Sequence, residues 1–268
     1  MRLELHNPEN TIEESYYAWR YMNNEKLMSL IKDNELYFAR LDQFKDPLEG
    51  LTLRDRHMLS MIRMTKEPNV LPEFKRAYEN EKVFKSNIRK WQNGLYASCW
   101  YLSKYKNEES ISMWDLYTNK DSFAISINFK ILKDLLQSSL ADFGDEEIIA
   151  ALYGKIEYLG AYDHSMRVIH TTENSMPGFI KTPSYQHENE VRLMLIRGEQ
   201  KYAVDRVGIS IKLVQSLAEF KDSVSIFTHP DMDIDTSAHW INYLNSLGYN
   251  AFMSSVLTKK NIKNFLTD

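Results

Sequence analysis

Hydrophobic and polar residues first alternate with period two along this chain and then repeat with the helical period. Over residues 15–21, Tyr17, Trp19 and Tyr21 fall on one face of a predicted strand, and Arg20 falls on the other. Apolar residues three and four positions apart then predict a helix, because that spacing places them on one side. The chain therefore opens with a strand, a helix and a strand, over residues 15–21, 24–34 and 35–41.

The stretch from residue 95 to residue 129 carries the clearest pattern. Residues 95–102 are rich in aromatic and small apolar residues, as a buried strand is, and residues 123–129 alternate with period two. Between them, Asn107 or Ser110 can cap a short helix that places Met113, Trp114 and Tyr117 on one face. We expect two strands that bracket this helix to form the wall of a pocket.

The remaining pattern predicts an α+β fold. Residues 51–93 are predicted to be a helical insertion, and amphipathic segments cover residues 131–140 and 146–153. Further strands are predicted at 155–159, 185–196, 207–211, 223–227 and 251–253, with helices through 213–217 and 240–247. Residues 1–14 are expected to be a loose lead-in. The sequence predicts one domain, residues 1–268, with a mixed or antiparallel central sheet flanked by helices.

Composition narrows the class of protein. Of 268 residues, 43% are hydrophobic and 26% are charged, as in ordinary globular proteins. No apolar run approaches the roughly 18 residues of a membrane helix, and the first residues lack the apolar core of a signal peptide. The single cysteine, Cys99, excludes an internal disulfide and a four-cysteine zinc site. These features predict a cytoplasmic protein without a membrane partner.

Charge gives a weaker indication of partners. The net charge of −4 provides no overall attraction to nucleic acid, although Lys259, Lys260 and Lys263 leave a local basic patch open. No glycine-rich phosphate-binding loop of either common pattern is present.

Three charged residues share one face of the predicted strand over residues 185–196. Glu188, Glu190 and Arg192 are two residues apart, and strand side chains repeat with period two. Neighbouring carboxylates raise each other's pKa unless a cation intervenes, and Arg192 can act as that cation. The row is either a charged surface or the rim of an active site.

Arg20 is the second candidate, because its planar guanidinium can bind a phosphate or a carboxylate. An exposed residue with a surface partner is the equal alternative. Asp46 and Glu49 belong to a turn marked by Pro47 and Gly50, and a structural role is favoured for both.

Two further groups favour structural roles. Residues 229–235 resemble a calcium loop only superficially, because Thr236 stands where glycine is needed and Asn242 where the glutamate belongs. Helix capping by Asp235, Thr236 or Ser237 is the preferred interpretation of that segment. Cys99 follows the pattern of a buried packing residue.

Several short boxes, in order along most of the chain, resemble the bacterial domain of unknown function numbered twenty-nine seventy-one. The boxes are Leu36–Phe38, Phe44–Glu49, Ser98–Trp100, Glu109–Tyr117 and Glu188–Arg192, within a resemblance that runs from about residue 16 to residue 256. One departure is Lys45, where the family usually has asparagine. The resemblance implies no established activity.

The order of candidates is also similar to that of ADP-ribosyltransferases. In that architecture an early strand carries a histidine or arginine, a central segment carries polar and aromatic residues, and a late strand carries the glutamate. The resemblance implies that Arg20 holds the diphosphate of NAD and that Ser112, Trp114 and Tyr117 line the nicotinamide site. It also implies that Glu190 is catalytic and that Glu188 serves the acceptor. The departure is the absence of a Ser-Thr-Ser triplet.

Three functions follow as hypotheses. The first is an ADP-ribosyltransferase-like enzyme that uses NAD, of the kind found among bacterial toxins and phage-defence effectors, with a protein or nucleic acid as acceptor. The second is a module that binds a nucleotide or a partner without catalysis. The third is a metal-dependent nuclease that uses Asp46, Glu49, Glu188 and Glu190, and it requires carboxylates that converge on Mg²⁺.

Overall fold

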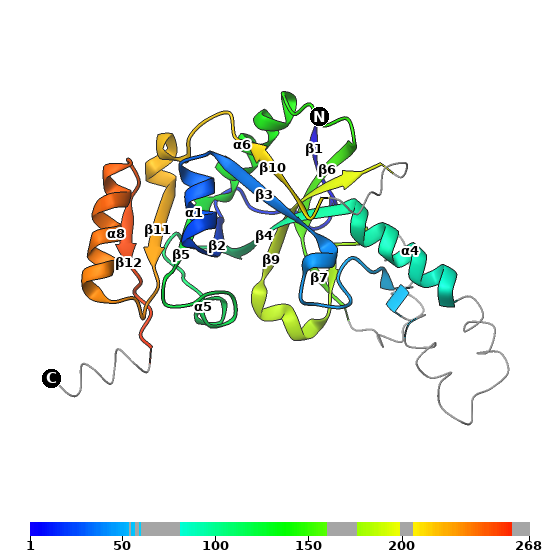
Figure 1. The fold of residues 1–268 in the computed structure, drawn as a ribbon, viewed down its shortest axis with the longest axis horizontal. Coiled ribbons are helices and arrows are strands. Elements are labelled where there is room, and N and C mark those ends of the chain that lie inside the picture. Colours follow the sequence, from blue (N-terminus) through cyan, green and yellow to red (C-terminus); the bar gives the residue numbers. More distant parts are fainter. Residues whose placement is uncertain (54, 57–58, 60–80, 160–175, 199–205, 259–268) are drawn as a thin grey trace.

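A ten-stranded sheet forms the centre of the computed structural model, which describes all residues except 54, 57–58, 60–80, 160–175, 199–205 and 259–268 (Figure 1). The main strand order is β1-β6-β9-β4-β2-β5-β11-β12, and β3 and β10 extend it to the side. The strands are β1 (Leu3–Leu5), β2 (Tyr17–Asn23), β3 (Glu35–Arg40), β4 (Leu95–Ser103), β5 (Ser122–Asn128), β6 (Ile148–Lys155), β9 (Glu190–Arg197), β10 (Gly208–Lys212), β11 (Val224–Thr228) and β12 (Ala251–Met253). A separate pair consists of β7 (Glu157–Tyr158) and β8 (Ile180–Lys181). The predicted α+β fold with a mixed sheet is confirmed.

Strands β2 and β3 share one edge of β4, and this arrangement divides the sheet. Strand β2 pairs with residues 101–103 of β4, and β3 pairs with residues 96–97. Between these two pairings, Ser98–Trp100 of β4 has no partner on this edge among the described strands. On its other edge, residues 95–101 of β4 pair with β9, including the stretch that is open toward β2 and β3. The sheet therefore opens between β2 and β3.

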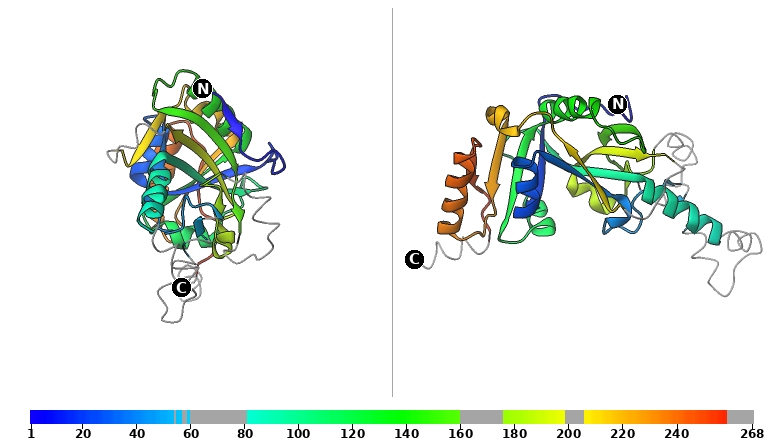
Figure 2. Two further views of the ribbon diagram at one scale, coloured as in Figure 1. Left: turned by 90° about the vertical axis from the view of Figure 1, so that its right-hand side faces the viewer. Right: turned by 45° about the horizontal axis from the view of Figure 1, so that its top comes forward.

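Helices cover both faces of the sheet and extend beyond it. They are α1 (Asn24–Ile31), α4 (Glu81–Gly94), α5 (Ile111–Tyr117), α6 (Phe129–Ala141) and α8 (Ile234–Ser246). Helix α4 projects away from the sheet at the end opposite α8 (Figure 2). None of the helices within the described residues is long and apolar enough to cross a membrane.

Side-chain caps explain where several helices begin. The side chains of Asn23, Ser110 and Asn128 accept hydrogen bonds from backbone N–H groups in the first turns of α1, α5 and α6. Asp233 caps α8, so the caps predicted at Asp235, Thr236 or Ser237 are wrong. Asn34 and Gly248 adopt positive φ angles of 52° and 88°, where the predicted first helix and α8 give way to strands.

The main core lies on the face of the sheet that α1 and α6 cover. Leu27 of α1 and Leu136 of α6 are fully buried there with Phe38, Tyr96 and Trp100 from the strands. On the opposite face, α5 contributes to a smaller aromatic cluster that contains Trp19, Tyr21, Trp114, Ala124 and Phe227. A third cluster around Phe179 and Met194 continues this face toward β9.

Three other predictions about local structure were also wrong. Residues 3–5 are not a loose lead-in but strand β1, which pairs in parallel with β6. Most of the amphipathic segment over residues 146–153 belongs to β6, where a bulge between Ile148 and Ala150 leaves buried residues three positions apart. A 3₁₀ segment, Leu217–Ser223, replaces the helix expected through 213–217.

The helical insertion predicted over residues 51–93 lies largely outside the described residues, apart from α4, which begins at Glu81, and a few positions near residue 55.

Candidate functional site

A cavity of about 230 Å³ lies where β2 and β3 separate. Arg20, Tyr117, Glu188 and Glu190 all line it, although they come from three separate parts of the sequence. Aromatic rings form much of the remaining wall, together with apolar and polar residues: Trp19, Tyr21, Met22, Lys26, Ala39, Phe44, Ala97, Cys99, Trp100, Tyr101, Met113 and Lys181. The cavity thus combines apolar rings with a few charged groups, as small-molecule sites do.

Arg20 occupies the opening in the sheet. Its Nη1 donates a hydrogen bond to Oγ of Ser98 at 3.0 Å, and its Nη2 donates to the backbone oxygen of Tyr37 at 3.2 Å. The guanidinium carbon lies 5.5 Å from the ring centre of Trp100, close enough for a cation–π contact. Burial lowers the pKa of Arg20 below its ordinary value.

Within the described part of the chain, Arg20 forms no ion pair with a carboxylate. A half-buried cation without an acidic partner is unusual, because buried charges are normally paired. Two of its five N–H groups are engaged by the two hydrogen bonds, so further donors remain for a ligand.

Glu188 and Glu190 reach the cavity from different local structures. The strand predicted from residue 185 begins only at Glu190, and Pro183–Glu188 forms a 3₁₀ turn with the proline at its start. Asn189 joins the two with a left-handed φ of 35°, a conformation that asparagine adopts more readily than most residues. The prediction that Glu188 shares a strand face with Glu190 is therefore wrong, although both carboxylates still line the cavity.

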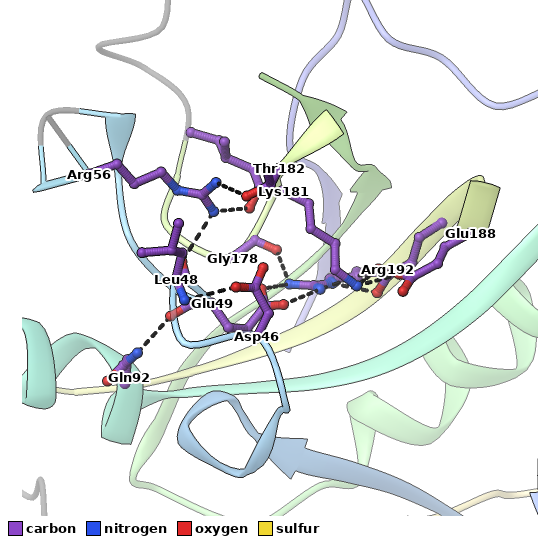
Figure 3. Close-up of polar contacts among 12 residues, drawn as sticks. Asp46, Leu48, Glu49, Arg56, Gln92, Gly178, Lys181, Thr182, Glu188 and Arg192 are labelled. Carbon is purple, nitrogen blue, oxygen red and sulfur yellow. Dashed lines mark hydrogen bonds and ion pairs between the residues drawn. The ribbon is translucent and has the colours of Figure 1, made fainter. Parts of the chain in front are cut away.

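A row of buried ion pairs extends from these carboxylates into the protein (Figure 3). Lys181 pairs with Glu188 and lies 3.2 Å from an oxygen of Glu190. Arg192 donates from Nε to Glu190 at 2.6 Å, and from its two terminal nitrogens to Glu49 at 2.5 and 2.9 Å. Negative and positive side chains alternate along this row, and this alternation allows five charged side chains to be buried together.

These contacts set opposite pKa directions for the two glutamates. Burial acts to raise the pKa of Glu190, but Arg192 and Lys181 outweigh burial and lower this pKa to about 2. Burial raises the pKa of Glu188, against the opposing effect of Lys181. Glu190 is therefore ionised at neutral pH, whereas Glu188 takes up a proton more readily than an ordinary glutamate.

Helix α5 contributes only part of what the sequence predicts. The hydroxyl of Tyr117 donates a hydrogen bond to Glu188, and 45% of this side chain is exposed. Met113 also lines the cavity. Trp114 is 1% exposed, as predicted for a core residue, but it packs against Tyr21 and does not line the cavity.

Ser112 is exposed on α5 and lies outside the cavity wall. The expectation that Ser112 and Trp114 contact a cofactor here is therefore not supported by their positions. Trp114 is buried and Ser112 is exposed, as the helical spacing of apolar residues in α5 indicates. That spacing does not show which side of a short helix faces a cavity.

The turn around Glu49 is structural, as predicted. The Asp46 carboxylate accepts a hydrogen bond from the backbone N–H of Leu48, and Glu49 is fully buried against Arg192. Among the residues that the structure describes, no three His, Cys, Asp or Glu side chains converge to hold a metal ion. Three of the four carboxylates of the nuclease hypothesis, Glu49, Glu188 and Glu190, instead form ion pairs with Arg192 or Lys181.

Sequence reasoning missed Lys181 and misjudged Cys99. Lys181 is 5% exposed and bridges the two glutamates, but it ends a stretch whose mixed polarity gave no pattern. Cys99 is half-buried and lines the cavity beside Glu190. Burial, and to a smaller extent the negative charge of Glu190, raises the pKa of the Cys99 thiol well above its ordinary value. A largely protonated thiol is a poor nucleophile at neutral pH.

Comparison with models of known families, with curated proteins and with solved structures yields no match for this chain. The two resemblances drawn from the sequence therefore stay predictions, and the site's own chemistry has to support any function.

Proposed function

We propose that this chain is an ADP-ribosyltransferase-like enzyme that cleaves NAD at the bond between nicotinamide and ribose. The observation that carries the proposal is the meeting of Arg20, Tyr117, Glu188 and Glu190 around one aromatic cavity. The first and last of these residues are 170 positions apart, so no local pattern of residues brings them together.

The chemistry matches the charges on the cavity wall. When the bond between C1′ and nicotinamide breaks, the electron pair leaves with nicotinamide and the ribosyl carbon becomes electron-poor. A carboxylate near that carbon stabilises the positive charge. Glu190 suits this role because its low pKa keeps it ionised.

The neighbouring residues supply binding and proton transfer. Arg20, which has no acidic partner among the described residues, would bind the diphosphate of NAD. The cavity's rings provide flat apolar surfaces for nicotinamide. Glu188, whose pKa burial raises, would take the proton from the hydroxyl of an acceptor.

One observation favours a second candidate, a binding module without catalysis. Both oxygens of Glu190 already accept hydrogen bonds from Arg192, and Lys181 lies close to one of them. These cations reduce the negative charge that Glu190 presents to a ligand. A binding module would hold NAD in the cavity and leave it intact.

Nicotinamide release from NAD by purified protein, with cell lysate as the source of acceptors, separates the two candidates. Wild type should release nicotinamide, and Glu190→Gln should slow the release by roughly a hundredfold to a thousandfold. Glu188→Gln should be affected less when water is the acceptor. Glu4→Gln, at the exposed position of the edge strand β1, is the matched control and should behave as wild type.

Because Glu190→Gln also removes a charge from the buried network, each variant is assayed below its own melting temperature. Binding of NAD by wild type without any nicotinamide release would favour the binding module. An unchanged rate in Glu190→Gln would show that the catalytic carboxylate is a different residue.

A further inference from the structure

A second cavity, of about 480 Å³, adjoins the first. The two share Arg20, Met22, Lys26 and Ala39, and the second extends between α1 and β3. The first cavity alone is smaller than the roughly 300–1,000 Å³ of typical small-molecule sites, whereas the two together fall within that range. One elongated ligand can therefore occupy both.

The junction of the cavities carries positive charge. Arg20 and Lys26 line both cavities, and Arg20 forms no ion pair with a carboxylate in the described part of the chain. An anionic group in the middle of the ligand would provide the missing partner for this half-buried guanidinium. The ligand that fits has an anionic centre and a cyclic group at each end.

Tyr37 offers an aromatic wall in the second cavity. Its ring lies across β10, where a Cβ atom on Gly208 would come within 2.0 Å of the Tyr37 hydroxyl oxygen. A side chain at residue 208 would therefore displace the ring from this position. Stacking on such a ring suits a nucleobase and tolerates any base.

Two carboxylates, Glu25 and Glu35, line the same cavity. Carboxylates accept hydrogen bonds from the hydroxyl groups of a ribose, and they repel a phosphate placed on the same sugar. These two carboxylates would therefore disfavour a nucleoside that carries a 2′-phosphate.

We propose that the second cavity binds the adenosine half of NAD, with Tyr37 against the base, and that Glu25 and Glu35 select NAD over NADP. This inference rests on the proposed function, because it assumes that the ribose next to nicotinamide occupies the first cavity. It adds a binding site on α1 and β3 and a specificity for the unphosphorylated dinucleotide.

Calorimetric titration with products tests the inference without any catalytic turnover. The probes are ADP-ribose, ribose 5-phosphate and ADP-ribose 2′-phosphate. ADP-ribose should bind to wild type at least about tenfold more tightly than either of the other two. Tyr37→Ala should weaken ADP-ribose binding by about tenfold and leave ribose 5-phosphate unaffected. Tyr105→Ala, at a tyrosine that is 68% exposed and outside both cavities, is the matched control.

Two further substitutions test whether the carboxylates discriminate against the 2′-phosphate. Glu25→Gln and Glu35→Gln together should narrow the difference between ADP-ribose and its 2′-phosphate, because they remove the repulsion and keep the shape. Equal affinities for ADP-ribose and ribose 5-phosphate, no effect of Tyr37→Ala, or no binding of any probe would overturn the inference. If ADP-ribose binds as expected but wild type releases no nicotinamide from NAD, the enzyme proposal fails and the second cavity stands.

Discussion

Replacing Arg192 with methionine should be among the most destabilising single changes in this protein. All five N–H groups of Arg192 donate hydrogen bonds, to Glu49, Glu190 and the backbone oxygen of Gly178 at 2.5–3.3 Å. Arg192 and Glu49 are both 0% exposed. Methionine fills a similar volume but leaves the Glu49 carboxylate buried without its ion pair.

Breaking a buried pair from one side costs about 3–5 kcal/mol. With roughly 2–4 °C per kcal/mol for domains of this size, the melting temperature of Arg192→Met should fall by about 6–20 °C. Urea unfolding followed by tryptophan fluorescence gives the free energy directly. Arg206→Met is the matched control, because Arg206 is 47% exposed and pairs with Asp145 at the surface. Such a pair contributes about 1 kcal/mol or less.

A double variant tests whether the unpaired charge causes the loss. Glu49→Gln in the Arg192→Met background removes the orphaned carboxylate, so the pair of changes should cost less than the sum of the two single changes. The reasoning would be refuted by a loss below about 1 kcal/mol in Arg192→Met. Simple additivity in the double variant would refute it as well.

Three other predictions concern Trp114, Glu190 and Tyr117. Trp114→Ala should cost about 3–5 kcal/mol in a denaturant melt, because the ring is 1% exposed, and a loss below about 1 kcal/mol would contradict its place in the core. The folded-state pKa of Glu190, about 2, lies below its ordinary value of 4.5, so its stabilisation is complete above pH 4.5 and is lost as the pH falls toward 2. Acid titration of wild type should therefore lose about 3 kcal/mol that Glu190→Gln does not lose, and parallel curves would argue against the ion pairs. Tyr117→Phe, which removes the hydroxyl that donates to Glu188, should slow nicotinamide release by about tenfold, whereas Ser112→Ala should stay within about twofold of wild type.

Elements with a strong local pattern could be predicted from the sequence. Strands β2, β3, β4 and β5 begin and end within two residues of the predictions, because each combines a continuous or alternating pattern of apolar residues with a nearby cap or turn. Asn34, at a left-handed φ, also follows a local rule. Such signals depend only on neighbouring residues in the sequence, so they can be recognised without knowledge of the fold.

Features that depend on distant partners could not be predicted. Strand β1 has only three residues and gains its place by pairing with β6, about 150 residues away. Lys181 becomes a site residue only because the turn that ends at Glu188 folds back beside it. Asn189 does interrupt the strand pattern, and its left-handed tendency is the one local signal that could have separated Glu188 from Glu190.

The central claim is that the first cavity presents Glu190 to the ribose carbon of NAD. A crystal structure with an NAD analogue whose nicotinamide bond cannot break tests it most directly. The account predicts the nicotinamide among the rings of the first cavity, the diphosphate against Arg20 and the C1′ atom about 3–4 Å from a Glu190 oxygen. An analogue bound elsewhere, or one held in the cavity with Glu190 turned away from the ribose, would contradict it.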